Sequence, residues 1–308
     1  MRNSLTIGTR GSQLALWQSQ FVKNQLERHF SDIEVHLKVI KTTGDTIQNR
    51  SLVGLGKGVF TKEIENALLI DDIDLAVHSL KDLPTELPAG LCIAAIPARE
   101  DPRDVLITAT GCSLESLPEA AKIGTTSPRR KAQLLYIRPD VQVVDVRGNV
   151  DTRLRKLHET DLDGIILAAA GIKRLLNPEI ITQFFDTEQM VPAVGQGALA
   201  IETREGDSRV AKLITPLNDH RAAAEITAER ALLENLGGGC QVPIGAYAEY
   251  INAELSLVGA VCHPEGSRRI MERATGTPDT AKHLGEVVAE KLKNSGATEL
   301  LKVQESDR

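Results

Sequence analysis

The apolar positions of the first hundred residues recur with two different spacings. Strands are predicted where apolar residues alternate or run together, at 5–8, 34–40, 74–78 and 91–96. Helices are predicted where they recur every three or four positions, over 14–28 and near 61–69, with Ser12 as the N-cap of the first. This β-α-β-α-β order favours a mostly parallel sheet covered by helices.

A second α/β pattern follows the polar segment EDPR at 100–103, which is a candidate hinge because it contains a proline. Strands are predicted at 105–108, 122–124, 141–146 and 165–168, and helices at 128–137 and 150–157. The segment VPAVGQG at 191–197 is predicted to be a second connection between the two α/β patterns, after the one at 100–103, since an apolar strand resumes at 198–202. These two connecting segments are called the crossings. Two crossings predict a discontinuous first domain and a cleft between two α/β domains.

The C-terminal third of the chain has a different pattern. A helix is predicted over 221–236, and it ends in three glycines. Residues 244–276 alternate like a small antiparallel sheet, with turn signals at Asn252 and at 264–266, and a last helix covers 280–294. These elements predict a third, α+β domain.

The composition is that of a water-soluble globular chain rather than a membrane or disordered one. Of 308 residues, 42% are hydrophobic and 25% are charged, and no apolar run approaches the roughly 18 residues of a membrane helix. The N-terminus has no apolar segment typical of a signal peptide, and the four cysteines form no C-x-x-C pair. We therefore expect a reduced, cytoplasmic protein with no metal site.

Charge is distributed unevenly along the chain. The formal net charge of −6 and the 3% aromatic content argue against nucleic-acid binding. Residues 122–174, however, hold 11 Lys and Arg against 6 Asp and Glu, a net of +5. A basic middle segment in an acidic protein indicates a confined anion site.

The segment HSLKDLP at 78–84 follows a predicted apolar strand. Ligands of open α/β sheets bind at the carboxyl ends of strands, so Asp82 beside Lys81 is a candidate site carboxylate. The competing interpretation is a solvated turn with a local ion pair, worth about 0–1 kcal/mol.

Basic residues follow three strands of the second α/β pattern. In GTTSPRR, hydroxyl residues and a proline open a helix whose free N–H groups and arginines suit an anion, although plain N-capping would also explain them. RGNVDTR and a Lys–Arg pair follow the next two strands. Guanidinium groups bind carboxylate or phosphate bidentately, so their convergence favours such a ligand.

The loop GGGCQVP at 237–243 presents Cys240 after three glycines. Most free cysteines are small buried hydrophobes, but the glycines leave this thiol without side-chain cover. It could be a nucleophile or an attachment point, and no adjacent histidine indicates a cysteine-protease pair.

As an ordered set, these segments closely resemble the porphobilinogen deaminase (hydroxymethylbilane synthase) family. The matching stretches span about 7–248 and include GTRGSQLALWQ, DLAVHSLKDLP, GTTSPRRKAQL, VRGNVDTRLRKL, VPAVGQGALAIE and GGGCQVPIGAYA. The resemblance implies two periplasmic-binding-protein-like (type II) α/β domains and a small C-terminal α+β domain. It places them at 1–99 with 198–217, at 103–193, and at 218–308.

The resemblance also implies a reaction. The family joins four porphobilinogen molecules head to tail, releases ammonia each time, and frees hydroxymethylbilane for tetrapyrrole synthesis. A dipyrromethane cofactor, bound by a thioether, primes the chain, and Cys240 matches the cysteine that carries it. We expect a cytoplasmic monomer that passes its product to uroporphyrinogen III synthase, without nucleic acid or membrane.

Site residues follow from the resemblance by position. Asp82 matches the catalytic aspartate. Cofactor binding is expected of a set of hydroxyl, basic and glycine positions: Ser79, Lys81, Thr125, Thr126, Ser127, Arg129, Arg130, Arg147, Gly148 and Arg153. Substrate binding is expected of an overlapping set: Arg10, Ser12, Lys57, Phe60, Arg147, Arg153, Arg174 and Gln196.

Two other hypotheses explain part of the pattern. A non-enzymatic two-domain receptor for a small polyanion would account for the cleft and the arginines but not for GGGCQVP. A cysteine-dependent transferase acting on another acidic substrate would account for Cys240.

Overall fold

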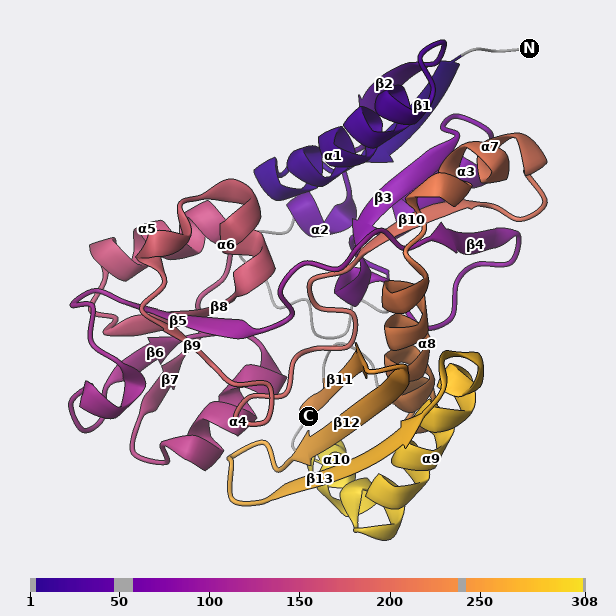
Figure 1. Cartoon of the computed structure of the whole chain (residues 1–308). Helices are drawn as coiled ribbons and strands as arrows, with labels where there is room; N and C mark the ends of the chain where they lie inside the picture. The colour runs from indigo at the N-terminus through magenta and orange to yellow at the C-terminus, as the bar shows by residue number, and fades with distance from the viewer. Residues whose placement is uncertain (1–3, 47–57, 238–241, 307–308) are drawn as a thin grey trace. The chain divides into compact units, whose positions relative to one another are not determined.

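The computed structural model describes residues 4–46, 58–237 and 242–306, and the chain divides into two compact units (Figure 1). The first unit is Met1–Glu100 with Ala198–Ala223, and the second is Asp101–Gly197 with Ala224–Arg308. The C-terminal elements thus belong to the second compact unit. The finer division into three domains stays a prediction.

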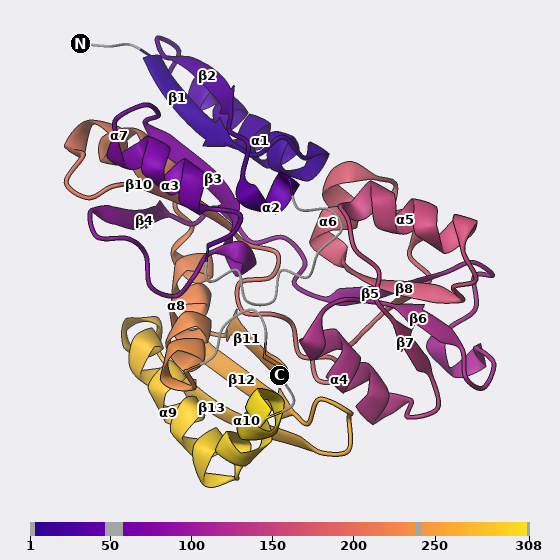
Figure 2. The ribbon, with the colours of Figure 1, turned by 180° about the vertical axis from the view of Figure 1, so that it is seen from behind.

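The first unit is built on a five-stranded sheet in the order β2-β1-β3-β10-β4. Its strands are β1 (Ser4–Thr9), β2 (Glu34–Val39), β3 (Leu75–Ser79), β4 (Leu91–Ala95) and β10 (Leu199–Arg204). Helices α1 (Gln13–His29) and α7 (Ser208–Ile214) pack on one face, and α3 (Lys62–Leu69) packs on the other (Figure 2). Shorter turns complete it: α2 (Thr43–Thr46), η1 (Leu80–Asp82) and η4 (Thr215–Leu217).

The second unit contains another five-stranded sheet, in the order β7-β6-β8-β5-β9. Its strands are β5 (Asp104–Thr108), β6 (Lys122–Gly124), β7 (Gln142–Val144), β8 (Gly164–Ala168) and β9 (Gln183–Phe184). Helix α4 (Pro128–Ile137) packs on one face, and α5 (Val150–Glu159) and α6 (Ala169–Leu175) pack on the other. Two short turns join these elements: η2 (Leu114–Ser116) and η3 (Pro178–Ile180).

The same unit carries a three-stranded antiparallel sheet in the order β11-β12-β13. Its strands are β11 (Ile244–Ile251), β12 (Glu254–Cys262) and β13 (Arg269–Gly276). Apolar residues of this sheet form one core with three helices: α8 (His220–Asn235), α9 (Ala281–Asn294) and α10 (Ala297–Ser306). The turn η5 (Pro278–Thr280) precedes α9. Two α/β sheets and a C-terminal α+β part therefore confirm the predicted fold class.

Each α/β sheet has one strand that runs against the other four. β10 is antiparallel to β3 and β4, and β5 is antiparallel to β8 and β9. Both reversed strands come directly after a crossing, and each begins opposite the last residue of a parallel strand. The expectation of a mostly parallel sheet is thus met. Each reversed strand is antiparallel because the chain enters the sheet at the carboxyl ends of the parallel strands.

The N-cap residues predicted from the sequence are confirmed, whereas the last helix of the chain was not predicted. Ser12, Ser127 and Asn149 each accept a hydrogen bond from a first-turn N–H of the helix they precede. The last helix predicted from the sequence ends at 294, but α10 follows after Gly296, whose φ is +94°. Among the described residues, no helix is long and apolar enough to cross a membrane.

Candidate active site

A pocket in the first unit lies at the carboxyl ends of β1 and β3. These strands are parallel neighbours, so the residues that follow them lie close together. Five predicted site residues line the pocket together: Arg10, Ser12, Phe60, Ser79 and Asp82. Asp82 ends the turn η1 with an exposed side chain, while the preceding Leu80 is buried and holds the turn against the unit.

Arg10 is held in the pocket wall by two contacts. Its guanidinium pairs with Asp45 at 2.5 Å and lies over the Phe60 ring, 4.2 Å from the ring centroid. Burial alone would raise the pKa of Asp45, but hydrogen bonds from Arg10 and Thr42 outweigh it and hold that pKa below its usual value. The arginine is therefore fixed in orientation by groups of its own unit.

Two further residues of the pocket were not predicted from the sequence. Gln18 of α1 donates a hydrogen bond to the Ser79 hydroxyl at 2.8 Å, and His78 of β3 lies in the wall beside it. Gln18 and Ser79 are 61 positions apart, so no local pattern could pair them. His78 was visible as the one polar residue in the buried run LAVH at 75–78, and that signal could have identified it.

The second unit gathers polar groups at the carboxyl ends of β7, β6 and β8, which are adjacent parallel strands. Thr125 follows β6 and accepts a hydrogen bond from the Ser127 N–H at 3.2 Å, and Ser127 caps α4. The Thr126 hydroxyl donates to the Val146 carbonyl at 3.5 Å. The predicted hydroxyl residues thus shape the loop between β6 and α4.

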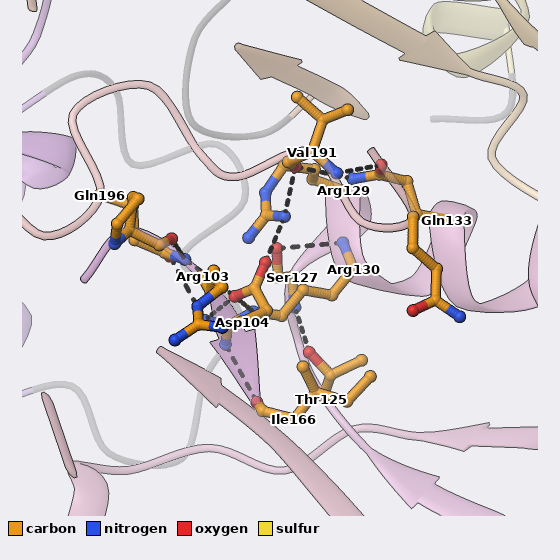
Figure 3. Close-up of polar contacts among 12 residues, drawn as sticks. Arg103, Asp104, Thr125, Ser127, Arg129, Arg130, Gln133, Ile166, Val191 and Gln196 are labelled. Atoms are coloured by element: carbon orange, nitrogen blue, oxygen red, sulfur yellow. Dashed lines mark hydrogen bonds and ion pairs between the residues drawn. The ribbon is translucent and has the colours of Figure 1, made fainter. Parts of the chain in front are cut away.

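Arg129 and Arg130 are buried, and both pair with Asp104 at the start of β5 (Figure 3). Arg129 Nη1 lies 2.7 Å from Asp104 Oδ2, and Arg130 Nη2 lies 2.8 Å from Oδ1. Backbone carbonyls of Val191 and Ile166 accept further bonds from the two guanidinium groups. An internal carboxylate therefore occupies much of the hydrogen-bonding capacity of both arginines, and their expected role in cofactor binding stays a prediction.

Asp104 is fully buried, and its charge is stabilised by these arginines. Burial alone would raise the pKa of Asp104, but the charges of Arg129 and Arg130 outweigh it and hold the pKa far below its usual range. Gln196 also contacts Asp104, because its Nε2 donates to Oδ1 at 3.0 Å and to the Pro102 carbonyl at 2.7 Å. The amide of Gln196 thereby joins the two crossing segments within the second unit.

Arg147 and Gly148 lie in the loop between β7 and α5, and Arg153 lies in the first turn of α5. Gly148 has a φ of +119°, and a Cβ there would lie 2.6 Å from the side chain of Thr152. Its carbonyl accepts a hydrogen bond from Arg153 Nε at 2.8 Å, so this arginine folds back over the loop. Arg147 and Arg153 are both partly exposed, unlike Arg129 and Arg130.

The Lys–Arg pair in α6 contacts both crossings. Arg174 Nη2 donates to the Gly197 carbonyl at 2.7 Å, and Lys173 pairs with Asp101 at 2.9 Å. Burial would raise the pKa of Asp101, but hydrogen bonds from Arg103 and Lys173 hold it far below its usual range. Part of the segment's positive charge is thus neutralised within the unit.

Two predicted site residues, Lys57 and Cys240, lie outside the described residues. Lys81 lies in η1 beside Asp82 and is partly exposed. The described residues contain no cluster of three metal-ligating side chains.

Known proteins resemble the chain along nearly its full length. A family model described as "Porphobilinogen deaminase, dipyromethane cofactor binding domain" matches residues 5–212, and one for the "Porphobilinogen deaminase, C-terminal domain" matches 223–294. A porphobilinogen deaminase of Syntrophomonas wolfei is 49% identical over 302 residues, which cover 98% of each chain. The chain belongs to the porphobilinogen deaminase family.

Another porphobilinogen deaminase, from Geobacter sulfurreducens, is 48% identical over 300 residues, or 97% of this chain and 94% of that protein. Among solved structures, the methionine-binding protein MetQ matches with a TM-score of 0.46 and 12% identity, covering 76% of this chain and 95% of that one. Family membership makes the chain a transferase of tetrapyrrole biosynthesis that acts on porphobilinogen and uses a dipyrromethane cofactor. It disfavours the hypothesis of a non-enzymatic receptor.

Proposed function

We propose that the chain condenses four porphobilinogen molecules head to tail, releases ammonia each time, and frees hydroxymethylbilane. The observation that carries this proposal is the pocket of the first unit, where Asp82 lies with Arg10 and Ser79 at adjacent strand ends. This pocket belongs to a member of the porphobilinogen deaminase family.

Asp82 is the catalytic carboxylate of the proposal. Loss of ammonia from an aminomethylpyrrole leaves a cationic methylene carbon conjugated to the ring. An exposed carboxylate at the pocket stabilises that cation and accepts the pyrrole N–H. Ser79 is held by Gln18 and Arg10 by Asp45, so the groups around Asp82 are positioned before a substrate binds.

Carboxylate binding is the proposed role of the second unit's strand ends. Every pyrrole of the substrate carries an acetate and a propionate side chain, and arginine pairs with such groups bidentately. Arg147 and Arg153 are partly exposed and suit direct pairing. Arg174 bonds the Gly197 carbonyl and Gln196 bonds Asp104, so we propose that these two residues also hold the backbone around the carboxylate-binding strand ends in place.

The residues of the second unit fit a dipyrromethane with several carboxylates. Arg129 Nε is a buried nitrogen without a hydrogen-bond partner among the described residues. Thr125, Thr126 and Ser127 lie in the adjoining loop, and Gly148 keeps the neighbouring loop free of a side chain. When bound through Cys240, the cofactor supplies the first pyrrole for condensation. Lys57 and Lys81 would add positive charge.

Intact mass spectrometry tests the cofactor. The purified protein should carry the added mass of one dipyrromethane, and Cys240→Ser should lack it. Unmodified protein that still forms hydroxymethylbilane would contradict the proposal.

Asp82→Asn tests the catalytic carboxylate. We expect the cofactor mass to be retained while product formation falls by about 10²–10⁴-fold. Asp32→Asn, which changes an exposed carboxylate of the same unit, is the matched control and should leave turnover unchanged. Near-normal turnover of Asp82→Asn would remove Asp82 from this role.

We also propose that the protein is a cytoplasmic monomer whose product passes to uroporphyrinogen III synthase. Support for a reducing compartment comes from Cys92, Cys112 and Cys262, which are free thiols. Light scattering coupled to size-exclusion chromatography measures the oligomeric state directly.

A further inference from the structure

The wall of the Asp82 pocket contains a histidine paired with a buried carboxylate. His78 lies in β3 with 5% of its surface exposed, and its Nε2 is 3.0 Å from Oε2 of Glu202. Glu202 lies on the neighbouring strand β10 and is fully buried. Because His78 also lines the pocket beside Ser79 and Asp82, the pair connects the buried interior of the unit to the pocket.

The contact with Glu202 orients the ring of His78. With Glu202 as a carboxylate, which only accepts hydrogen bonds, the proton of the ring lies on Nε2 and is donated to Oε2. The neutral ring then has its lone pair on Nδ1, and the structure gives Nδ1 no partner among the described residues. A carboxylate behind the ring and a lone pair on its other nitrogen are the arrangement of an oriented general base.

Ionisable groups from several elements lie near this ring. Glu202 faces it from β10, and Glu65 faces it from α3. Asp82 and Arg10 line the same pocket, and Asp45 already pairs with that arginine. Proton uptake at Nδ1 would therefore create an imidazolium beside an excess of carboxyl groups.

Glu65 is a second buried carboxyl group near the pair of His78 and Glu202. It is 5% exposed, and burial followed by the nearby charge of Glu202 raises its pKa. One oxygen of Glu65 and one of Glu202 are buried without a hydrogen-bond partner in the described part of the chain.

We propose that His78 is the general base of each condensation, an inference that rests on the proposed function. When a pyrrole α-carbon attacks the cationic methylene carbon, a C–C bond forms. The α C–H bond then breaks, its electron pair returns to the ring, and Nδ1 of His78 takes the proton. The imidazolium passes this proton to the ammonia that the same condensation released, which leaves as ammonium.

This division of labour leaves Asp82 ionised throughout. A carboxylate that itself took the α-proton would lose its charge while a cation was still beside it. With His78 as the acceptor, Asp82 stabilises the cation and the pair of His78 and Glu202 handles the proton. Glu202 is then a positioning residue, since it acts only through the ring.

Porphobilinogen deuterated at its free α-carbon tests the proposal on the holoenzyme. In the wild type we expect no appreciable isotope effect, because the base removes the proton quickly after C–C bond formation. In His78→Gln, turnover should fall by about 10²–10⁴-fold and a primary isotope effect should appear, since proton removal becomes rate-limiting. Undiminished turnover without an isotope effect would overturn the proposal.

The protonation of His78 can also be measured on the wild-type protein, so that this test does not depend on whether a variant folds. Nitrogen NMR of ¹⁵N-histidine-labelled holoenzyme, without substrate, should show His78 as a neutral ring protonated at Nε2 near neutral pH. A ring protonated at Nδ1, or at both nitrogens up to pH 8 and above, would overturn the proposal, because neither form can accept the α-proton there.

The variant Glu202→Gln tests whether Glu202 acts through His78 or only stabilises the fold. The amide keeps the shape of the side chain but removes the negative charge that stabilises the imidazolium. We expect a lower kcat with little change in KM, and an acid limb of the pH profile displaced to lower pH than in the wild type, because the imidazolium is no longer stabilised by a negative charge. A wild-type pH profile would show that Glu202 does not act through His78.

Failure of this proposal is distinguishable from failure of the proposed function. If wild-type protein forms no hydroxymethylbilane and carries no dipyrromethane, the function itself is wrong. If it does both, and His78→Gln keeps the cofactor mass and wild-type turnover, only the role of His78 is wrong.

Discussion

Replacing Asp104 by asparagine should destabilise the second unit strongly. The side chain is fully buried and pairs with the guanidinium groups of two arginine residues that are themselves at most 5% exposed. Asparagine has nearly the same shape, so the substitution removes the charge without opening a cavity. The two arginines would then keep buried positive charge with no carboxylate to balance it.

The expected loss is about 3–5 kcal/mol of unfolding free energy, the cost typical of breaking a buried ion pair by removing one partner. For a unit of this size that loss corresponds to a decrease in Tm of about 6–20 °C. Asp140→Asn is the matched control, because Asp140 pairs with Arg138 at 2.7 Å but the aspartate is 31% exposed. Because solvent screens that pair, Asp140→Asn should leave the unfolding transition nearly unchanged.

Urea unfolding followed by two probes distinguishes the two units. Trp17 is the only tryptophan of the chain and lies in the first unit, so its fluorescence follows that unit. Far-UV circular dichroism reports on both units. We expect Asp104→Asn to shift the dichroism transition to lower urea while the fluorescence transition changes much less.

The effect should also depend on pH in a definite direction. The pKa of Asp104 is depressed in the folded state, whereas an unfolded aspartate has a pKa of about 3.9. As the pH falls below about 4, the unfolded chain takes up the proton first, so the contribution of Asp104 is progressively lost. The difference between wild type and Asp104→Asn should therefore shrink in acid. A loss below about 1 kcal/mol at neutral pH would refute the reasoning.

Three other predictions concern single positions. Arg153→Leu should reduce cofactor loading measured by intact mass, whereas Arg155→Leu, at an exposed position two residues on, should load normally; equal loading would remove Arg153 from the carboxylate-binding set. The pKa of Glu65 is raised, so its contribution to the unfolding free energy of the wild type should be lost as pH rises through that pKa. Glu65→Gln should abolish this pH dependence, as measured by urea unfolding. An unchanged dependence of the unfolding free energy on pH would contradict the prediction. Gly148→Ala should cost more unfolding free energy than Gly111→Ala, since both have positive φ but only Gly148 would bring its Cβ into a neighbouring side chain; equal costs would show that the contact is relieved.

Sequence periodicity determined most elements of the fold because it depends on nearby residues. The predicted helix over 128–137 and strand over 122–124 agree with α4 and β6 residue for residue. The caps Ser12, Ser127 and Asn149 contact N–H groups only three residues away, so their role could be predicted without the tertiary structure. The ordered motifs likewise determined the family.

The contacts of the site were decided by tertiary structure alone. Net charge over 122–174 suggested free positive groups, but Arg129 and Arg130 pair with Asp104, which lies outside that segment. His78 meets Glu202 across 124 positions, and this contact exists only because β10 returns antiparallel beside β3. Burial and strand order bring these charges together, and neither property is encoded in the spacing of neighbouring residues.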